Sequence, residues 1–134
     1  MDLWSFVIRH PFLMGLTLVV LGMLLYEEVL VLLLRDWLIT VGEAVGLINH
    51  HSALVLDLRE DKEFKKGHIL GAEQVVASQL SGRLDDGKPL ILVLANDTDF
   101  LTIRNQLPKG IVERVKILRG GVTAWQEAGL PLVN

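Results

Sequence analysis

The chain has 134 residues, enough for one ordinary domain and an appendage but too few for two full domains. Its formal net charge is −3 and its basic residues form no cluster along the sequence, so we expect no nucleic acid as a partner. It contains no cysteine, which excludes disulfides, zinc thiolate sites and every mechanism based on a thiol.

Residues 1–34 are typical of a membrane anchor. Hydrophobic residues make up 51 % of the chain, and residues 11–26 carry no charge. As a helix these uncharged residues extend roughly 24 Å, short of a hydrocarbon core of about 30 Å, so the span needs residues from one side. With Trp4 and Arg9 at the interface, we expect one transmembrane helix over residues 6–26, which continues past the membrane surface to the end of the anchor.

The boundaries and orientation of the span leave alternatives. A span over residues 11–34 would place Glu27 and Glu28 inside the far boundary of the membrane, at a cost of a few kcal/mol unless they face a partner or water. Arg9 and Arg35 flank the apolar segment on opposite sides, so the distribution of positive charge does not determine which end is inside.

An uncleaved membrane anchor accounts for the apolar segment better than a cleaved signal peptide or a buried helix of a soluble protein. A cleaved signal peptide needs small residues at its cleavage site, and residues 24–34 (LLYEEVLVLLL) offer none. A buried helix of a soluble protein is normally apolar on one stripe, whereas aliphatic residues occupy all faces of residues 12–25. We therefore expect an uncleaved anchor.

Residues 35–134 alternate between short strand patterns and short helix patterns. In the first half of the domain we predict a strand at 37–40, a helix at 42–49, a strand at 52–59, a helix at 60–66 that ends at Gly67, and a strand at 72–76. A turn or helix at 78–84, capped by Ser78, and a turn at 85–88 follow. In the second half we predict a strand at 89–94, a helix at 98–107, a strand at 114–121 and a helix at 121–129 that Pro131 prevents from continuing. Such alternation indicates an α/β domain with a mostly parallel sheet flanked by helices.

Three stretches of this domain resemble the rhodanese-like family. Residues 55–72 (VLDLREDKEFKKGHILGA) resemble its Asp-x-Arg strand end, acidic helix and Gly-His-Ile-x-Gly-Ala loop, and residues 88–94 (KPLILVL) resemble the strand that enters its active loop. Residues 115–131 (VKILRGGVTAWQEAGLP) resemble its closing strand and Gly-Gly-x-x-x-Trp helix. The resemblance implies a small rhodanese-like domain whose structural motif residues are Asp57, Arg59, Gly67, His68, Gly71, Gly120, Gly121 and Trp125.

The order of the parts carries a second resemblance. A hydrophobic N-terminal helix at 1–34 followed by one such domain at 35–134 is similar to small bacterial membrane-anchored rhodanese-like proteins. This resemblance implies a single-pass protein of the bacterial inner membrane, with the lipid bilayer as a partner and the domain facing the cytoplasm.

The loop after the strand at 89–94 is where the resemblance implies a reaction. An active rhodanese has a cysteine at the end of this strand, and its thiolate accepts a sulfur atom as a persulfide. Counting five residues on from Pro89, or twenty-six back from Gly120, gives Leu94 at that position. Because leucine cannot act as a nucleophile, we expect no catalytic residue and no cofactor.

The rest of the loop also departs from the family pattern. Ala95 lies where a basic residue is common, Asp97 where glycine is common and Asp99 where an arginine is frequent. An anion-binding loop brings amides and positive charge towards the anion, whereas each carboxylate here opposes it by roughly 1 kcal/mol or more. The loop, Leu94, Ala95, Asn96, Asp97, Thr98 and Asp99, is therefore predicted to be degenerate.

Several of these residues invite a chemical role that we weigh against a structural one. Asn96, Asp97 and Asp99 could touch a hard cation, but we favour a solvated turn in which Asp97 or Asp99 caps the next helix. His68 could act as a general base and Asp57 with Arg59 as a catalytic pair; we expect all three to be structural. We expect no metal at His10, His50 and His51, and a core position for Trp125.

Two functions remain. The first is a catalytically inactive, membrane-tethered interaction or regulatory module whose partner is another membrane or membrane-associated protein. The second is an enzyme or small-anion sensor that uses the loop of Leu94 to Asp99 without a cysteine. We prefer the first, because the nucleophile and the positive charge of the loop are both missing.

Overall fold

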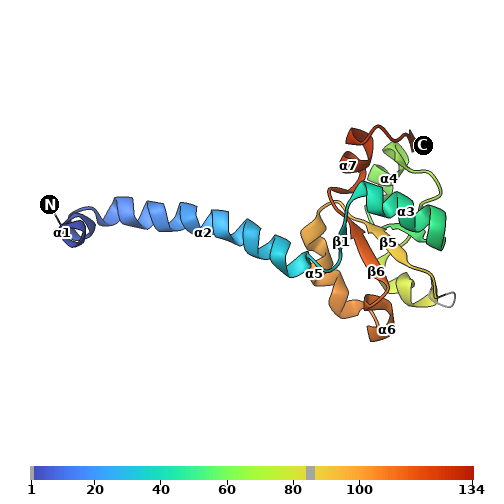
Figure 1. Ribbon diagram of the computed structural model, residues 1–134, viewed down its shortest axis with the longest axis horizontal. Helices are drawn as coiled ribbons and strands as arrows, with labels where there is room; N and C mark the ends of the chain where they lie inside the picture. The colour runs from blue at the N-terminus through green and yellow to red at the C-terminus, as the bar shows by residue number, and fades with distance from the viewer. Residues whose placement is uncertain (1, 84–86) are drawn as a thin grey trace. The chain divides into compact units, whose positions relative to one another are not determined.

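The computed structural model describes residues 2–83 and 87–134, and the chain divides into two compact units, Met1–Asp36 and Trp37–Asn134 (Figure 1). Two predicted features extend beyond the described residues: the end of the element at 78–84, at Leu84, and the turn at 85–88, which includes Asp85 and Asp86.

The first unit consists of two helices, α1 (Leu3–Arg9) and α2 (Pro11–Leu34). The backbone leaves the helical region at His10, with φ −127° and ψ 61°, because the residue before a proline is driven out of that region. Pro11 then opens α2 at the first helical position, where its missing N–H costs nothing. The prediction of one unbroken helix from residue 6 is therefore wrong.

Helix α2 is the one helix, within the described residues, that is long and apolar enough to cross a membrane. Its 24 residues extend about 36 Å, more than a hydrocarbon core of about 30 Å. Its bounds coincide with those of the alternative span, and its end at Leu34 also agrees with a helix that continues past the membrane surface, so Glu27 and Glu28 lie within the helix in either case. Its side chains before Leu34 are exposed or half-buried, unlike those of a core helix.

The second unit is built on a parallel five-stranded sheet in the order β1-β6-β5-β2-β4. The strands are β1 (Leu38–Ile39), β2 (Leu54–Asp57), β4 (Glu73–Gln74), β5 (Leu90–Val93) and β6 (Val115–Leu118). All four residues of the central strand β5 are buried, which explains the unbroken apolar run of its sequence. The predicted α/β fold with a mostly parallel sheet is confirmed.

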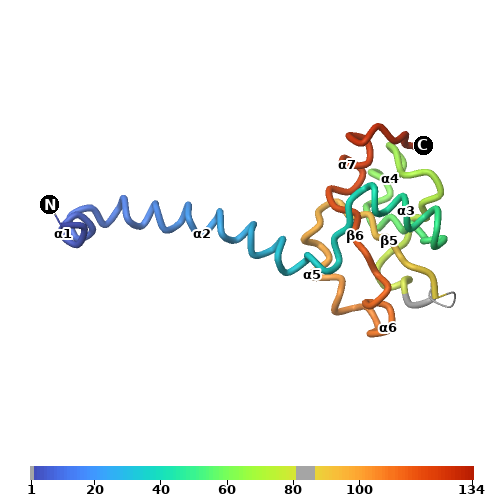
Figure 2. The backbone as a smooth tube through the Cα atoms, in the orientation of Figure 1, coloured from blue at the N-terminus to red at the C-terminus, as the bar shows by residue number. Residues whose placement is uncertain are grey.

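Helices cover the sheet on both faces. They are α3 (Val41–His51), α4 (Asp61–Lys66), η1 (Ala77–Arg83), η2 (Asp97–Asp99), α5 (Phe100–Ile103), η3 (Arg104–Gln106), α6 (Lys109–Val112) and α7 (Gly121–Glu127). One core cluster joins α3 and α7 to alternate strand residues such as Val55, Ile91 and Leu118. The intervening residues, such as Leu56 and Leu92, point to the other face and are also buried. The chain passes from β5 through α5 and α6 before it returns to β6 (Figure 2).

Several local predictions were wrong or incomplete. Two strands that we did not predict, β3 (His68–Ile69) and β7 (Leu132–Val133), form a second, antiparallel sheet. The helix predicted at 98–107 is divided into η2, α5 and η3, and α6 follows it. Ser78 is not a cap, because η1 begins one residue earlier and the N–H of Val76 reaches the Gln79 side chain at 3.4 Å instead.

Candidate functional site

The carboxyl ends of β2, β5 and β6 meet at one edge of the sheet, and the loops that leave them form the candidate site. In parallel α/β sheets this edge is where ligands and reactive groups collect. The loop after β5 carries Leu94 to Asp99, the turn after β6 carries Gly120 and Gly121, and the loop after β2 leads into α4.

Leu94 follows β5 directly, and its side chain is buried, with 4 % of its surface exposed. Its carbonyl oxygen is close to the turn after β6, since a Cβ built on Gly121 would lie 2.8 Å from it. Gly121 also has a positive φ of 55°. Glycine has no Cβ, so it allows both this backbone conformation and the close approach to the carbonyl oxygen. At the position where a reactive group would have to be presented, the structure has buried hydrocarbon.

The remainder of the loop is held by its own polar groups. The Oδ1 atom of Asn96 accepts hydrogen bonds from the Thr98 N–H at 3.2 Å and the Thr98 hydroxyl at 3.0 Å. Asn96 therefore caps η2, and the prediction that Asp97 or Asp99 is the cap is wrong. The helical turn begins at Asp97, one residue earlier than the pattern suggested, so the capping position falls on Asn96.

Asp97 has a different contact, which the sequence did not predict. Its Oδ2 atom accepts a hydrogen bond from the N–H of Gly120 at 3.1 Å and so joins the loop after β5 to the turn after β6. A bound anion at this edge would need such an N–H donor and would meet the carboxylate of Asp97 instead. Asp99 is exposed and adds a second negative charge to the same loop. The electrostatics of the loop disfavour an anionic substrate.

Asp57 and Arg59 form a buried pair at the end of β2. Asp57 is fully buried, and its carboxylate accepts hydrogen bonds from the Arg59 side chain at 2.8 to 3.1 Å and from the Arg59 backbone N–H at 2.9 Å. The same guanidinium donates to the carbonyl oxygen of Gly67 at 2.9 Å. These contacts fix the loops on either side of α4, as we expected of the pair.

The other predicted positions are distributed over the domain. His68 stacks on Phe64, with ring centroids 3.8 Å apart, and its Nδ1 lies 3.0 Å from the Phe64 carbonyl oxygen. Trp125 is buried in the core, as predicted, and donates from its indole N–H to the Pro131 carbonyl oxygen at 3.3 Å. Gly71 has a φ of 84° in the turn after β3.

The histidines outside the site offer no metal centre. His10 lies at the break between α1 and α2, and His50 and His51 are exposed in the last turn of α3. In the part of the chain that the structure describes, no three histidine, aspartate or glutamate side chains are grouped so as to hold a metal ion. Asn96 and Asp97, which a cation would need as ligands, already accept hydrogen bonds.

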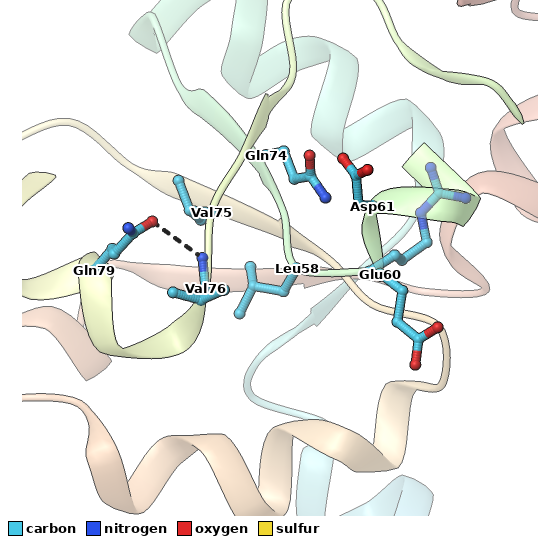
Figure 3. Close-up of a pocket in the computed structure, with 8 residues that line it drawn as sticks. Leu58, Glu60, Asp61, Gln74, Val75, Val76 and Gln79 are labelled. Carbon is cyan, nitrogen blue, oxygen red and sulfur yellow. Dashed lines mark hydrogen bonds between the residues drawn. The ribbon is translucent and has the colours of Figure 1, made fainter. Parts of the chain in front are cut away.

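A pocket of about 470 Å³ lies beside this edge of the sheet, and sequence reasoning did not find it (Figure 3). Its lining residues come from the loop after β2 and the start of α4, and from the end of β4 and the segment that follows into η1: Leu58, Arg59, Glu60, Asp61, Gln74, Val75, Val76 and Gln79. In the amide orientation that satisfies both partners, Gln74 donates to the Asp61 carboxylate at 3.0 Å and accepts from its N–H at 3.1 Å.

The charged groups that line this pocket are the carboxylates of Glu60 and Asp61 and the guanidinium of Arg59. Asp61 also accepts a hydrogen bond from Lys65 at 2.9 Å, and this bond raises the pKa of the exposed Lys65 amine above its usual value. The guanidinium of Arg59 is already bound to Asp57. The pocket therefore offers amides, carboxylates and apolar surface, but no uncommitted guanidinium for an anion.

Comparisons with known proteins agree with this geometry. The family model described as Rhodanese-like domain matches residues 40–128. Protein YibN of Escherichia coli (strain K12) is 34 % identical over 139 residues, which cover 99 % of this chain and 97 % of YibN. Thiosulfate sulfurtransferase GlpE of Shewanella oneidensis is 28 % identical over 93 residues, covering 67 % of this chain and 92 % of GlpE.

Among solved structures, a thiosulfate sulfurtransferase from Pseudomonas aeruginosa matches with a TM-score of 0.66. The match covers 81 % of this chain and 22 % of that chain at 22 % sequence identity. At this level of identity the likeness demonstrates the fold alone.

The buried pair gives a first prediction. We expect Asp57→Asn to lower the free energy of unfolding by about 3–5 kcal/mol, because it leaves the charge of Arg59 buried without its partner. Glu63→Gln makes the same chemical change in an exposed pair with Lys66 and should cost less than about 1 kcal/mol. Urea unfolding of the purified chain, followed by tryptophan fluorescence, measures both. Equal effects of the two variants would contradict the proposed role of Asp57.

The loop gives a second prediction. We expect Asp97→Ala to lower the free energy of unfolding by about 1–2 kcal/mol, since it removes the acceptor of the Gly120 N–H. Asp99→Ala, in the same loop, should change it by less than about 0.5 kcal/mol, because its exposed carboxylate caps no helix. If both variants keep full stability and lose a measurable enzymatic activity, the enzyme or sensor interpretation is correct instead.

Proposed function

The chain belongs to the rhodanese-like domain family, and from this premise we propose that it is a membrane-anchored member that does not transfer sulfur and acts as a protein-interaction or regulatory module. The observation that carries the proposal is the buried leucine at position 94, in a sequence with no cysteine.

The chemistry of the loop supports the absence of sulfur transfer. A persulfide forms only when a thiolate attacks the sulfur donor, and no side chain in this sequence can supply that thiolate. The surrounding loop also lacks the means to hold an anionic donor such as thiosulfate, since the Gly120 N–H is bound to Asp97 and Asp99 adds a further negative charge. A cysteine introduced at position 94 would therefore supply a nucleophile, but the negative charge of the loop would still oppose the binding of an anionic sulfur donor.

The preserved scaffold supports a binding role. The buried Asp57–Arg59 pair and the close approach of Gly121 to Leu94 keep the loops at the sheet edge in fixed positions without any reaction to serve. A rigid edge with exposed loops and an adjoining pocket is a suitable surface for another protein.

The anchor supports a partner in or near the membrane. Tethering raises the effective concentration of the domain towards membrane partners without any new contact. Glu27 and Glu28 lie within α2, and a span that covered the whole of this helix would make their carboxylates costly unless they faced water or a polar partner. From the resemblance to small bacterial membrane-anchored rhodanese-like proteins, we infer a single-pass protein of the bacterial inner membrane, with its domain in the cytoplasm.

Sulfur transfer from thiosulfate to cyanide tests the enzymatic part of the proposal. We expect no thiocyanate above the level of a heat-inactivated control, with GlpE of Shewanella oneidensis assayed alongside as an active relative. We expect Leu94→Cys to remain inactive as well, because the carboxylates of Asp97 and Asp99 still oppose an anionic donor. Catalytic turnover by the natural chain would refute the proposal, whereas turnover by Leu94→Cys alone would refute only the electrostatic part.

The absence of native cysteine makes the anchor easy to test, since a single introduced thiol is the sole site of maleimide labelling. In spheroplasts we expect a membrane-impermeant maleimide to label Asp2→Cys, and to label Glu127→Cys only after the membrane is opened. The chain should also stay with the membrane after carbonate extraction. Labelling of Glu127→Cys in closed spheroplasts would show that the domain faces the outside of the inner membrane. Release of the chain by carbonate would show that α2 is not a membrane anchor.

A further inference from the structure

Trp37 is the first residue of the domain, and its ring is held in a defined position. Its centroid lies 5.4 Å from that of the fully buried Phe100, and the guanidinium of Arg104 lies 5.9 Å from it, over the ring. The carbonyl oxygen of Trp37 accepts a hydrogen bond from the Ile117 N–H at 2.8 Å, which fixes the backbone at the start of β1. Trp37 is half-buried and Arg104 is exposed, so the pair presents an aromatic face with a cation on it.

Trp37 directly precedes β1, at the amino end of that strand. Parallel strands start at a common edge, and the segment after β5 must return to that edge before β6 begins, as its path through α5 and α6 shows (Figure 2). Arg104 lies midway along this return, and Lys109 begins α6, six residues before β6. The loop at the carboxyl end of β5 carries Asp97 and Asp99, and the exposed Arg119 follows β6 at the same edge.

Basic residues outnumber acidic ones in the described segments that lead into β5 and β6. In residues 87–89 and 104–116 the basic residues are Lys88, Arg104, Lys109, Arg114 and Lys116, and the acidic residue is Glu113. Asp85 and Asp86 precede β5 in the sequence and lie outside the described residues. Lys88, Arg114, Lys116 and Asp36 have interactions of their own, so the inference depends on the exposed Arg104 and Lys109.

The length of chain before Trp37 connects this edge to a membrane. Only Arg35 and Asp36 separate Leu34, the last residue of α2, from Trp37, and three residues extend at most about 11 Å. When α2 spans a bilayer, Trp37 is therefore within reach of the headgroup layer, whatever the angle between helix and domain. Tryptophan and arginine are the side chains that favour that layer.

We propose that Trp37, Arg104 and Lys109 form a docking surface for anionic phospholipid headgroups, which holds the domain against the membrane that α2 spans. The proposal rests on the membrane anchor proposed above. It commits to phosphatidylglycerol-type lipid, because Arg104 and Lys109 are exposed cations, Trp37 follows α2 by three residues, and the cytoplasmic leaflet of a membrane carries an anionic surface.

The test uses the full chain in nanodiscs, with a fluorophore on Asn105→Cys, next to Arg104, and a nitroxide on the lipid headgroups. We expect strong quenching in nanodiscs that contain phosphatidylglycerol, weak quenching in phosphatidylcholine alone, and loss of the difference at high salt. A fluorophore on the exposed Glu127→Cys, on α7, should be quenched little in either lipid.

Charge variants then identify the surface. Arg104→Gln and Lys109→Gln should each lower the ratio of docked to undocked domain about fivefold, and together they should abolish the lipid dependence. Lys62→Gln, on the exposed side of α4, removes the same charge elsewhere and should leave the ratio unchanged. Quenching that is independent of phosphatidylglycerol, or an equal loss in Lys62→Gln, would overturn the docking surface while the anchor stands. A chain that does not enter nanodiscs at all would overturn both proposals.

Discussion

The carboxylate of Asp57 is fully buried at the end of β2, and a buried charge persists in a protein only when its partners compensate for the water it has lost. Arg59 supplies that compensation through its side chain and its backbone N–H, and then reaches the carbonyl oxygen of Gly67 on the far side of α4. One ionic contact therefore determines the path of the chain from β2 to β3. None of its atoms is consumed by a reaction, so the contact serves the geometry of the sheet edge with or without catalysis.

The same edge has a buried leucine at the position where rhodanese-like enzymes are expected to carry a cysteine. A reactive cysteine must keep its thiolate charged and accessible to water. Its side chain therefore does not gain the free energy of burial that a core residue gains. Leu94 is buried instead, and burial of a leucine side chain contributes roughly 1.5–3 kcal/mol to stability. The hydrogen bond from Gly120 to Asp97 adds a contact between two loops and uses an N–H that could otherwise donate to an anion. Stability and binding of an anion make opposite demands on this loop, and here stability prevails.

Much of the architecture was accessible from the sequence, because its signals are local and strong. The buried run of β5, the period of α3 and the glycine that ends α4 each follow from one residue pattern, and the family resemblance gave their order. The two-residue strands β3 and β7 were missed, because such short segments acquire strand geometry only from each other. The break at His10 was visible in the proline that follows it, and the Thr40–Glu43 capping box of α3 was visible as Thr-x-x-Glu. The link from Asp97 to Gly120 joins residues 23 positions apart, so no local pattern could reveal it.

The contact between Gly121 and position 94 has a consequence for the substitutions that the fold admits. Gly121 approaches the carbonyl oxygen of Leu94 and not its side chain, so this close approach makes no demand on the type of residue at that position. The backbone path of the turn and the chemistry of the side chain at position 94 are thus specified by different atoms. A substitution at this position can change the chemical character of the sheet edge while the turn keeps its tight fit.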